Sequence, residues 1–411
     1  MKHQEPRTSS IPPRTRLLAG VAALAAGCGF AAAASAQAPL PLKICSIDDR
    51  SGAAADVGIE SLNGLNMVIE PLNAKGGIKG RKIEIVAYDG KTDPQLTATF
   101  ATRCAEDDKG LMIIGGSPSA PAAAMIPVAT QNQIPYYMLS AAANNLTDNA
   151  TWHFRFGPKA AQDGIAVADA LIDLGFKKAA VINNSTPFGT DGARSTIEAL
   201  EAKGIQIVTH QTYDAAATDV APQVVNLRQA GADVILVFPY PADGARVART
   251  IRQLGIKTPV IMPRVGLMAA FRKLAADSAD GILVPTSVDL TRPEVAKLFQ
   301  DYNAKFKPIA PSPSPAQGYD AATLAVKVLS DAEVQKAIDG GNLADARKAI
   351  RDATKRLGDF QGMQGQQGVS YQFGSGQHHG VPDRGFFVFT EVTGKGEQLV
   401  VPDMKKLKPK S

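Results

Sequence analysis

The chain has 411 residues, a length that is enough for about two domains of roughly 150 residues each. Its formal net charge is +5. Most of the positive excess lies at the ends, because residues 1–36 hold four of the 44 Lys and Arg, and four more Lys lie between Lys405 and Lys410. The remainder is close to neutral, which argues against a nucleic-acid partner, since a phosphate backbone requires a clustered basic face.

Residues 1–36 have the pattern of a secretory signal peptide. A basic start is followed by an apolar, alanine-rich run over residues 17–34 and by the small-x-small ending Ala34-Ser35-Ala36. We therefore expect a mature chain that begins at Gln37 and is exported to the periplasm.

Cys28 leaves a second reading of this segment open. It could become the lipidated N-terminus of a lipoprotein, although Ala25 stands where such sites usually carry Leu, Val or Ile. After residue 36, no apolar run approaches the about 20 residues of a membrane span.

Apolar periodicity predicts alternating strands and helices in the first third of the mature chain. The spacing of Ile59, Leu62, Leu65 and Ile69 is helical, and Asp93-Pro94 has the capping residue and first-turn Pro of a second helix. The remaining predicted elements are strands at 42–47, 83–87, 111–114 and 135–139 and a helix at 117–131.

The same alternation continues through the second third. Strands are predicted at 179–182, 205–208, 234–238, 260–262 and 281–284, and helices at 189–203, 220–230 and around 247–254. Such alternation indicates an α/β protein with doubly wound parallel sheets, which bind ligands beyond the carboxyl ends of their strands.

The last third has a different pattern. Residues 292–356 are predicted to be mostly helical, and a Gly/Gln-rich linker at 361–368 separates them from β-like segments at 369–373, 386–392 and 398–401.

Local motifs for catalysis are absent from the sequence. There is no G-x-S-x-G, no phosphate loop, no H-E-x-x-H and no C-x-x-C. His378-His379 is expected on an exposed turn, so we predict no metal and no cofactor. The chain is therefore predicted not to be an enzyme, with a secreted hydrolase and a ligand sensor as the competing hypotheses.

A collinear set of short motifs resembles the leucine/isoleucine/valine-binding protein family of periplasmic receptors. The motifs are Leu72-Asn73-Ala74-Lys75-Gly76-Gly77-Ile78-Lys79-Gly80, Tyr88-Asp89, Ile113-Ile114-Gly115-Gly116, Gln133-Ile134-Pro135, Phe188-Gly189, Ala230-Gly231-Ala232-Asp233, Asp280-Gly281 and Gly318-Tyr319-Asp320. The resemblance implies a monomeric solute-binding receptor that captures a small molecule and meets the membrane permease subunits of an ABC importer.

The fold implied by the resemblance is two doubly wound lobes joined by a three-segment hinge. The expected boundaries are 37–155 plus 286–362 for the first lobe and 156–285 plus 363–411 for the second. The Gly/Gln-rich linker is then the third crossing segment.

The resemblance also implies a ligand between the lobes. In the family, one wall of the ligand cleft belongs to the first lobe. By resemblance, that wall corresponds here to Ser117 and Ser119 at a helix start and to Ser140, Ala141 and Ala142 after the fourth strand. A helix N-terminus favours a carboxylate. The alternative for the two helix-start serines is simple capping.

In the second lobe the resemblance implies ligand contacts from Phe188, Tyr240 and Arg264. Amino-acid-binding members usually have a Thr where this chain has Ala142 and an acidic residue where it has Arg264. We therefore predict an organic acid without an α-amino group, most simply an aromatic carboxylate. The alternatives are a branched-chain or other amino acid, and an Arg264 that faces solvent or is shifted by one residue.

Cys45 and Cys104 remain after signal cleavage and would be in an oxidising compartment. With the strand order of this family, the helix that contains Cys104 crosses over the strand that contains Cys45. The resemblance thus implies that a disulfide is feasible, with two separate buried thiols as the alternative.

Overall fold

The computed structural model describes residues 38–52, 54–374 and 377–404. The predicted signal peptide, the possible lipoprotein site at Cys28 and the terminal lysines from Lys405 to Lys410 lie outside these residues. None of the helices in the described ranges is both long and apolar enough to cross a membrane.

The first lobe is built on a five-stranded parallel sheet in the order β2-β1-β3-β4-β5. Successive residues of a strand enter opposite cores: Ile44 packs on one face and Cys45 on the other. Burial on both faces explains why these strands read as continuous apolar runs. The strands are β1 (Leu42–Asp48), β2 (Ile83–Asp89), β3 (Met112–Gly115), β4 (Tyr136–Met138) and β5 (His153–Arg155).

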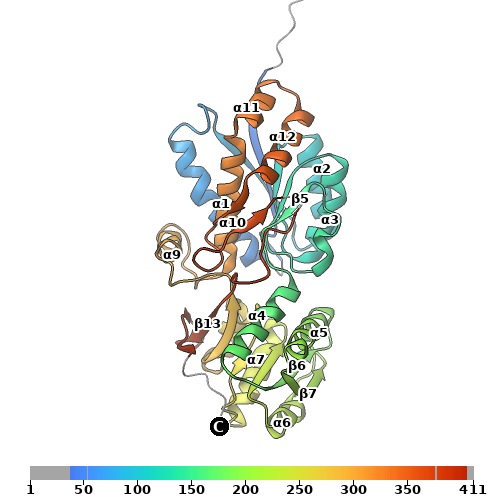
Figure 1. The fold of residues 1–411 in the computed structure, drawn as a ribbon, viewed down its shortest axis with the longest axis vertical. Coiled ribbons are helices and arrows are strands. Elements are labelled where there is room, and N and C mark those ends of the chain that lie inside the picture. Colours follow the sequence, from blue (N-terminus) through green and yellow to red (C-terminus); the bar gives the residue numbers. More distant parts are fainter. Residues whose placement is uncertain (1–37, 53, 375–376, 405–411) are drawn as a thin grey trace, which may run out of the picture. The chain divides into compact units, whose positions relative to one another are not determined.

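Helices cover both faces of this sheet, with α1 and α10 on one side and α2 and α3 on the other (Figure 1). α1 and α10 can approach closely because Gly64 has no side chain. A Cβ at this position would lie 2.0 Å from the carbonyl oxygen of Pro315. The helices of this lobe are α1 (Ala55–Ala74), α2 (Pro94–Glu106), α3 (Ser119–Gln131), α9 (Pro293–Lys305), α10 (Pro313–Leu329), α11 (Ala332–Asp339) and α12 (Leu343–Arg356).

The second lobe is built on a seven-stranded sheet in the order β14-β13-β10-β9-β8-β6-β7. The five strands from β6 to β10 are parallel, whereas β13 and β14 are antiparallel. The strands are β6 (Lys178–Asn184), β7 (Gln206–Tyr213), β8 (Val234–Phe238), β9 (Val260–Ile261), β10 (Ile282–Thr286), β13 (Val388–Thr393) and β14 (Gln398–Val400).

The helices of the second lobe include two, α4 and α8, for which the apolar pattern made no prediction. Alternate residues of β6 again enter two cores, so this sheet is also covered on both faces. The predicted α/β class with two doubly wound lobes is confirmed. These helices are α4 (Ala160–Asp173), α5 (Pro187–Ala202), α6 (Ala221–Gln229), α7 (Pro241–Gln253) and α8 (Ala269–Ala275), and three 3₁₀ turns accompany the two lobes, at Asn144–Thr147, Val265–Leu267 and Ala276–Ala279.

Cys45 and Cys104 form a disulfide between β1 and α2. Both residues are fully buried, and Gly110 packs against the two sulfur atoms. The disulfide implied by the resemblance is thus present, and it fastens α2 to the central part of the first sheet.

The Gly/Gln-rich stretch leads back into the first lobe. β11 (Gly358–Phe360) and β12 (Tyr371–Phe373), on either side of it, pair with each other, and Tyr371, Phe373 and Phe386 belong to the core that includes α1 and α10. Packing therefore assigns β12 and the chain up to Phe386 to the first-lobe core, beyond the expected boundary at 362/363. Aromatic burial, which the Gly/Gln composition does not reveal, accounts for this difference.

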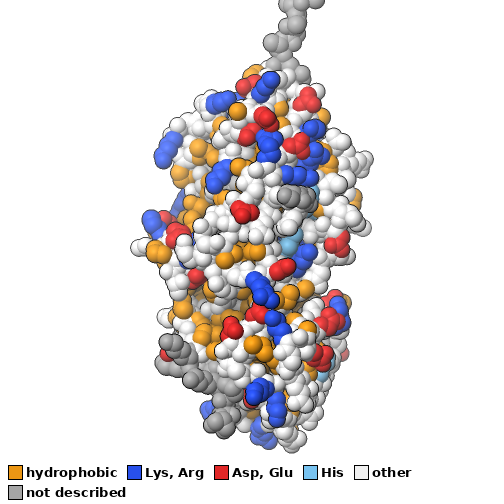
Figure 2. Space-filling model, viewed as in Figure 1, with side chains coloured by type: hydrophobic (Ala, Val, Ile, Leu, Met, Phe, Trp, Pro, Cys, Tyr) orange, Lys and Arg blue, Asp and Glu red, His pale blue; other side chains and the backbone are white. Residues whose placement is uncertain are grey.

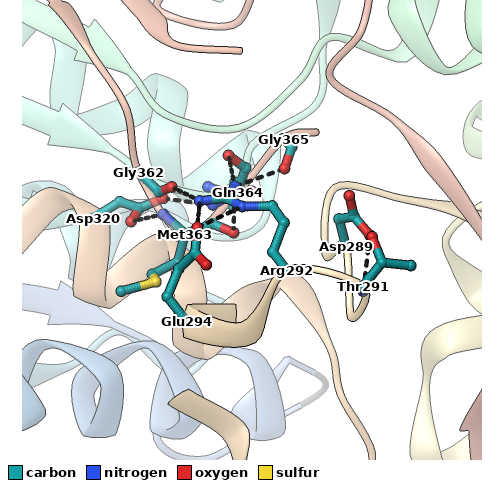
Figure 3. A network of polar contacts seen from close by, with 9 residues as sticks. All are labelled: Asp289, Thr291, Arg292, Glu294, Asp320, Gly362, Met363, Gln364 and Gly365. Carbon is teal, nitrogen blue, oxygen red and sulfur yellow. Dashed lines mark hydrogen bonds and ion pairs between the residues drawn. The ribbon is translucent and has the colours of Figure 1, made fainter. Parts of the chain in front are cut away.

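A buried Arg and a buried Asp hold this stretch from opposite sides (Figure 3). The Arg292 guanidinium donates to the carbonyl oxygens of Gly362 and Gly365, 2.8 and 2.7 Å away. The Asp320 carboxylate accepts from the backbone N–H groups of Met363 and Gln364. The segment that looked like a flexible linker is therefore fixed by charge-assisted hydrogen bonds.

Candidate ligand-binding site

The start of α3 offers hydrogen-bond donors at the carboxyl edge of the first sheet. Pro118 is the N-cap, so Ser119 and Ala120 are the first two helical residues and Pro121 has no N–H. The first amides of a helix have no intrahelical acceptor. Two free amides and the helix dipole thus point at one spot, which is the arrangement that binds a carboxylate.

Ser119 also organises the loop after β4. Its Oγ accepts from the backbone N–H groups of Ala142 and Ala143, at 3.0 and 3.1 Å, and it does not cap α3. The hydroxyl hydrogen of Ser119 remains available as a donor. The capping alternative is therefore wrong for this residue, and Ser119 joins the two predicted parts of the first-lobe wall.

Ser117 lies deeper than expected. Its side chain is only 3% exposed, and its backbone N–H donates to Asp48 Oδ1 at 3.2 Å. That N–H is consequently not free for a ligand, and Ser117 Oγ has no hydrogen-bond partner among the described residues. Ser117 is therefore buried two residues before the start of α3.

Ser140, Ala141 and Ala142 form the neighbouring loop, as predicted. Ser140 Oγ donates to Gln317 Oε1 of α10, and the carbonyl of Ala141 accepts from Arg155 Nη2 at 2.8 Å. Side chains from α10 and β5 therefore set the backbone direction of a loop that is predicted to contact the ligand.

Arg155 was missed by the sequence reasoning. It is fully buried, and burial, reinforced by the nearby Arg264, lowers its pKa to about 10. Its Nη2 donates to the carbonyl oxygens of Ala141 and Ala143 in the loop after β4. Its Nε and Nη1 have no hydrogen-bond partner within the described chain. The one available signal was a charged residue inside an otherwise apolar run that ends at Phe156.

Phe188 and Tyr240 are brought together in the second lobe. Their rings are stacked with centroids 5.7 Å apart and planes at 18°, although 52 positions separate them in the chain. Phe188 lies in the first turn of α5 and Tyr240 caps α7, just beyond the carboxyl ends of β6 and β8. They remain 37% and 43% exposed, so they present an aromatic surface.

Arg264 does not present a free cation. Its Nε pairs with Asp163 Oδ2 and its Nη2 donates to the carbonyl of Pro158 at 3.1 Å. Burial raises the pKa of the Asp163 carboxyl, and Arg264 opposes that shift. In this structure α4, which the pattern did not predict, supplies an anion for Arg264, and a contact of Arg264 with the ligand stays a prediction.

The backbone at Arg264 is strained. Its φ is 55° and its ψ is −56°, and Val265 N–H donates to the Pro263 carbonyl, which makes a tight three-residue turn of the rare, strained kind. Strain of this sort concentrates at functional positions. The turn holds the guanidinium against Asp163.

Two groups of predicted residues are thus assembled, one in each lobe. The first supplies polar donors and the second an aromatic surface, and Arg264 bonds to the carbonyl of Pro158, which lies between β5 and α4. A pocket of about 630 Å³ lies elsewhere, between α4 and β13, and contains none of the predicted residues. No three His, Cys, Asp or Glu side chains in the described ranges are placed to hold a metal ion.

On the face drawn in Figure 2, acidic and basic side chains are interspersed over both lobes, and no large patch of a single sign of charge is visible there.

Comparison with known proteins agrees with this arrangement. The periplasmic binding protein family model matches residues 41–396. The chain is 28% identical over 350 residues to Leu/Ile/Val-binding protein homolog 7 of Brucella abortus strain 2308, covering 80% of this chain and 84% of that protein. It is 25% identical over 275 residues to the Leu/Ile/Val-binding protein of Escherichia coli K12, covering 64% and 72%.

Among solved structures, the branched-chain amino acid transporter substrate-binding protein of Streptococcus pneumoniae, in complex with isoleucine, has the same fold. The TM-score is 0.72 at 22% identity, over 88% of this chain and all of that chain. The two doubly wound lobes, the donors at the α3 N-terminus and the family match over residues 41–396 together lead to one conclusion: this chain belongs to the periplasmic binding protein family, whose members are solute-binding receptors.

Proposed function

We propose that this protein captures an amino acid with an apolar side chain, of the branched-chain type, and delivers it to an ABC importer. The observation that carries the proposal is the α3 N-terminus, where Ser119 and Ala120 contribute the first two amides of the helix and Ser119 Oγ accepts from the Ala142 amide of the neighbouring loop. A carboxylate would bind there through charge-assisted hydrogen bonds.

The Arg264–Asp163 ion pair removes the main physical objection to an amino acid. A free Arg264 would repel an α-ammonium group, but the neighbouring Asp163 carboxylate balances its charge. The names of the Brucella and Escherichia relatives, which both specify Leu, Ile and Val, support the same ligand class.

Phe188 and Tyr240 would receive the apolar side chain of the ligand. Their exposed rings are the large apolar surface that the second lobe offers at the carboxyl ends of β6 and β8. The same rings favour a second candidate, an aromatic carboxylate, because a flat ring can stack on them.

A ligand panel separates these candidates. We expect calorimetry to show binding of L-leucine, L-isoleucine and L-valine, a large loss with leucinol, which lacks the carboxylate, and a smaller loss with 4-methylpentanoate, which lacks the ammonium. Binding of benzoate without any amino acid would instead establish the aromatic acid. Equal affinity for leucine and leucinol would contradict a carboxylate at the α3 N-terminus.

The remaining parts of the proposal concern setting and partners. We infer a monomer that is exported to the periplasm by residues 1–36, binds its ligand without chemical turnover and docks on permease subunits. Co-purification with the permease in the presence of ligand, and unchanged ligand recovered from the protein by mass spectrometry, are the expected results.

A further inference from the structure

Asp48 lies directly behind the candidate carboxylate site. It is the last residue of β1 and is 4% exposed. Its Oδ1 accepts from the backbone N–H groups of Asp49, at 3.0 Å, and Ser117, at 3.2 Å. Ser117 is two residues before the start of α3, so this carboxyl group positions the chain that enters the helix.

The other oxygen of this carboxyl group is unpaired. Asp48 Oδ2, Ser117 Oγ and the Tyr136 hydroxyl are all buried without a hydrogen-bond partner in the described part of the chain. The Tyr136 hydroxyl lies against the same turn, since a Cβ on Gly116 would be 1.9 Å from it. Buried polar groups that lack partners require an explanation, and loss of the negative charge would lower the cost of burying the unpaired Oδ2.

The charges around Asp48 oppose one another. Asp49 adds negative charge and raises the pKa of Asp48, whereas the Arg50 guanidinium, which donates to the carbonyls of Tyr88 and Ser46, lowers it by a smaller amount. Beyond Tyr136, Arg155 is engaged by the loop after β4. Burial, with a smaller contribution from Asp49, raises the pKa of Asp48 to about 7.

We propose that Asp48 is a positioning residue that takes up a proton when a carboxylate occupies the N-terminus of α3, so that ligand capture is coupled to pH. This inference rests on the proposed function. An ionised Asp48 and a ligand carboxylate would both use the positive end of α3, one through Ser117 N–H and the other through the amides of Ser119 and Ala120. Two like charges that share a buried site cannot both stay ionised cheaply, so binding draws one proton from solvent.

Linkage sets the size of the effect. Where Asp48 is ionised in the free protein and protonated in the complex, affinity falls by up to tenfold for each unit of rising pH. With the free pKa near 7, the fall begins near pH 7. Asp48→Asn, which imitates the neutral acid, should bind with little dependence on pH.

The test is calorimetry of the purified mature protein with L-leucine, or with benzoate if that is the acid that binds, from pH 6 to 8.5 in phosphate and in Tris. Wild type is expected to take up a fraction of a proton per ligand that increases between pH 7 and 8. Asp49→Asn is the matched control: it removes the neighbouring charge that helps to raise the pKa of Asp48, so the fall in affinity should persist but begin at a lower pH. Carbon-13 chemical shifts of the Asp48 carboxyl, with and without ligand, test the same point in the wild-type chain if Asp48→Asn does not fold.

The outcomes separate this inference from the proposed function. An affinity that is flat over this pH range, a pH dependence that persists in Asp48→Asn, or an Asp48 carboxyl that stays ionised in the complex would overturn the proton uptake alone. Absence of binding by every carboxylate of the panel, or leucinol binding as tightly as leucine, would overturn the proposed function and the inference with it.

Discussion

The two lobes contribute to the candidate site by different means. In the first lobe, two buried side chains hold the backbone from behind, because Asp48 accepts from Ser117 N–H and Arg155 donates to the Ala141 carbonyl. The half-buried Ser119 accepts from the amides of Ala142 and Ala143. In the second lobe, Phe188 and Tyr240 project from two helix starts and bind mainly to each other.

This difference assigns different tasks to the two surfaces. Hydrogen bonds are directional, and a donor with a fixed direction rejects a ligand that lacks the matching acceptor. Apolar contact depends on area and is not directional. The first lobe is therefore suited to select the polar end of a ligand, and the second to accept side chains of several shapes.

The largest effect is expected from breaking the ion pair of the second lobe. Arg264→Ala leaves the Asp163 side chain, which is 9% exposed, without its cation, and removing one partner of a buried pair typically costs about 3–5 kcal/mol. Because Arg264 itself is partly exposed, we expect about 3 kcal/mol, measured as the free energy of unfolding in urea. The double variant Asp163→Asn/Arg264→Gln should recover most of this loss. A loss below about 0.5 kcal/mol would mean that the Arg264–Asp163 ion pair does not stabilise the folded protein.

Ser119→Ala tests the hydrogen bonds of the first lobe. It removes the acceptor of two backbone amides, and a group left unsatisfied costs about 1–3 kcal/mol. We expect leucine affinity to fall by about 10- to 100-fold, measured by calorimetry. Thr130→Ala, an exposed change at the far end of α3, is the control and should leave affinity unchanged. Equal losses in the two variants would contradict the role of Ser119.

The pH dependence of stability should also differ between the regions. Burial, followed by repulsion from Arg155, lowers the pKa of His379 to about 3. Below pH 6.5 the unfolded chain binds a proton that the folded chain does not, so stability falls as pH decreases from 6.5 towards 3, by up to about 1.4 kcal/mol per pH unit.

Urea unfolding between pH 4.5 and 7.5 measures this slope. His379→Gln should reduce the slope of unfolding free energy against pH by an amount that corresponds to at most one bound proton. His210→Gln, a change on the edge strand β7 of the second lobe, should alter it less, because His210 is less enclosed and has fewer repelling neighbours. A slope that His379→Gln leaves unchanged would refute the assignment.

The smallest effect is expected for the aromatic pair. Phe188→Ala and Tyr240→Ala should each change the free energy of unfolding by less than about 1 kcal/mol, because both rings are already more than a third exposed. A double-mutant cycle should give a coupling of about 0.5–1.5 kcal/mol for the stacked rings. Leucine affinity should fall in each single variant, and an unchanged affinity in both would place the ligand elsewhere.

Much of the fold could be predicted from the sequence, because its signals are local. Short apolar runs predicted the strands at 42–47 and 234–238, which appear as β1 and β8, and Asp93-Pro94 predicted the start of α2, where the Asp93 side chain accepts from two amides. Residues within one turn or one strand produce these patterns, so no distant partner is needed to recognise them.

The site could be predicted only as separate pieces. The resemblance brought out Ser119, Ala142, Phe188 and Tyr240, but composition and spacing could not show that Ser119 bonds the 142–143 amides or that the two rings stack. Nor could they show that Arg155 is buried behind the binding loop, since no local pattern distinguishes a buried Arg from an exposed one.

By itself, the sequence determined the α/β class, the two-lobed arrangement through its resemblance and a candidate helix start at Ser117–Ser119, which the structure places at Ser119. The tertiary structure alone decided how charge is distributed at the site. Arg264 meets an Asp163 that is 101 positions away, and Ser117 N–H meets an Asp48 that is 69 positions away. Electrostatic effects depend on distance in space and on burial, so the charge state of a group is set by partners that chain folding brings together.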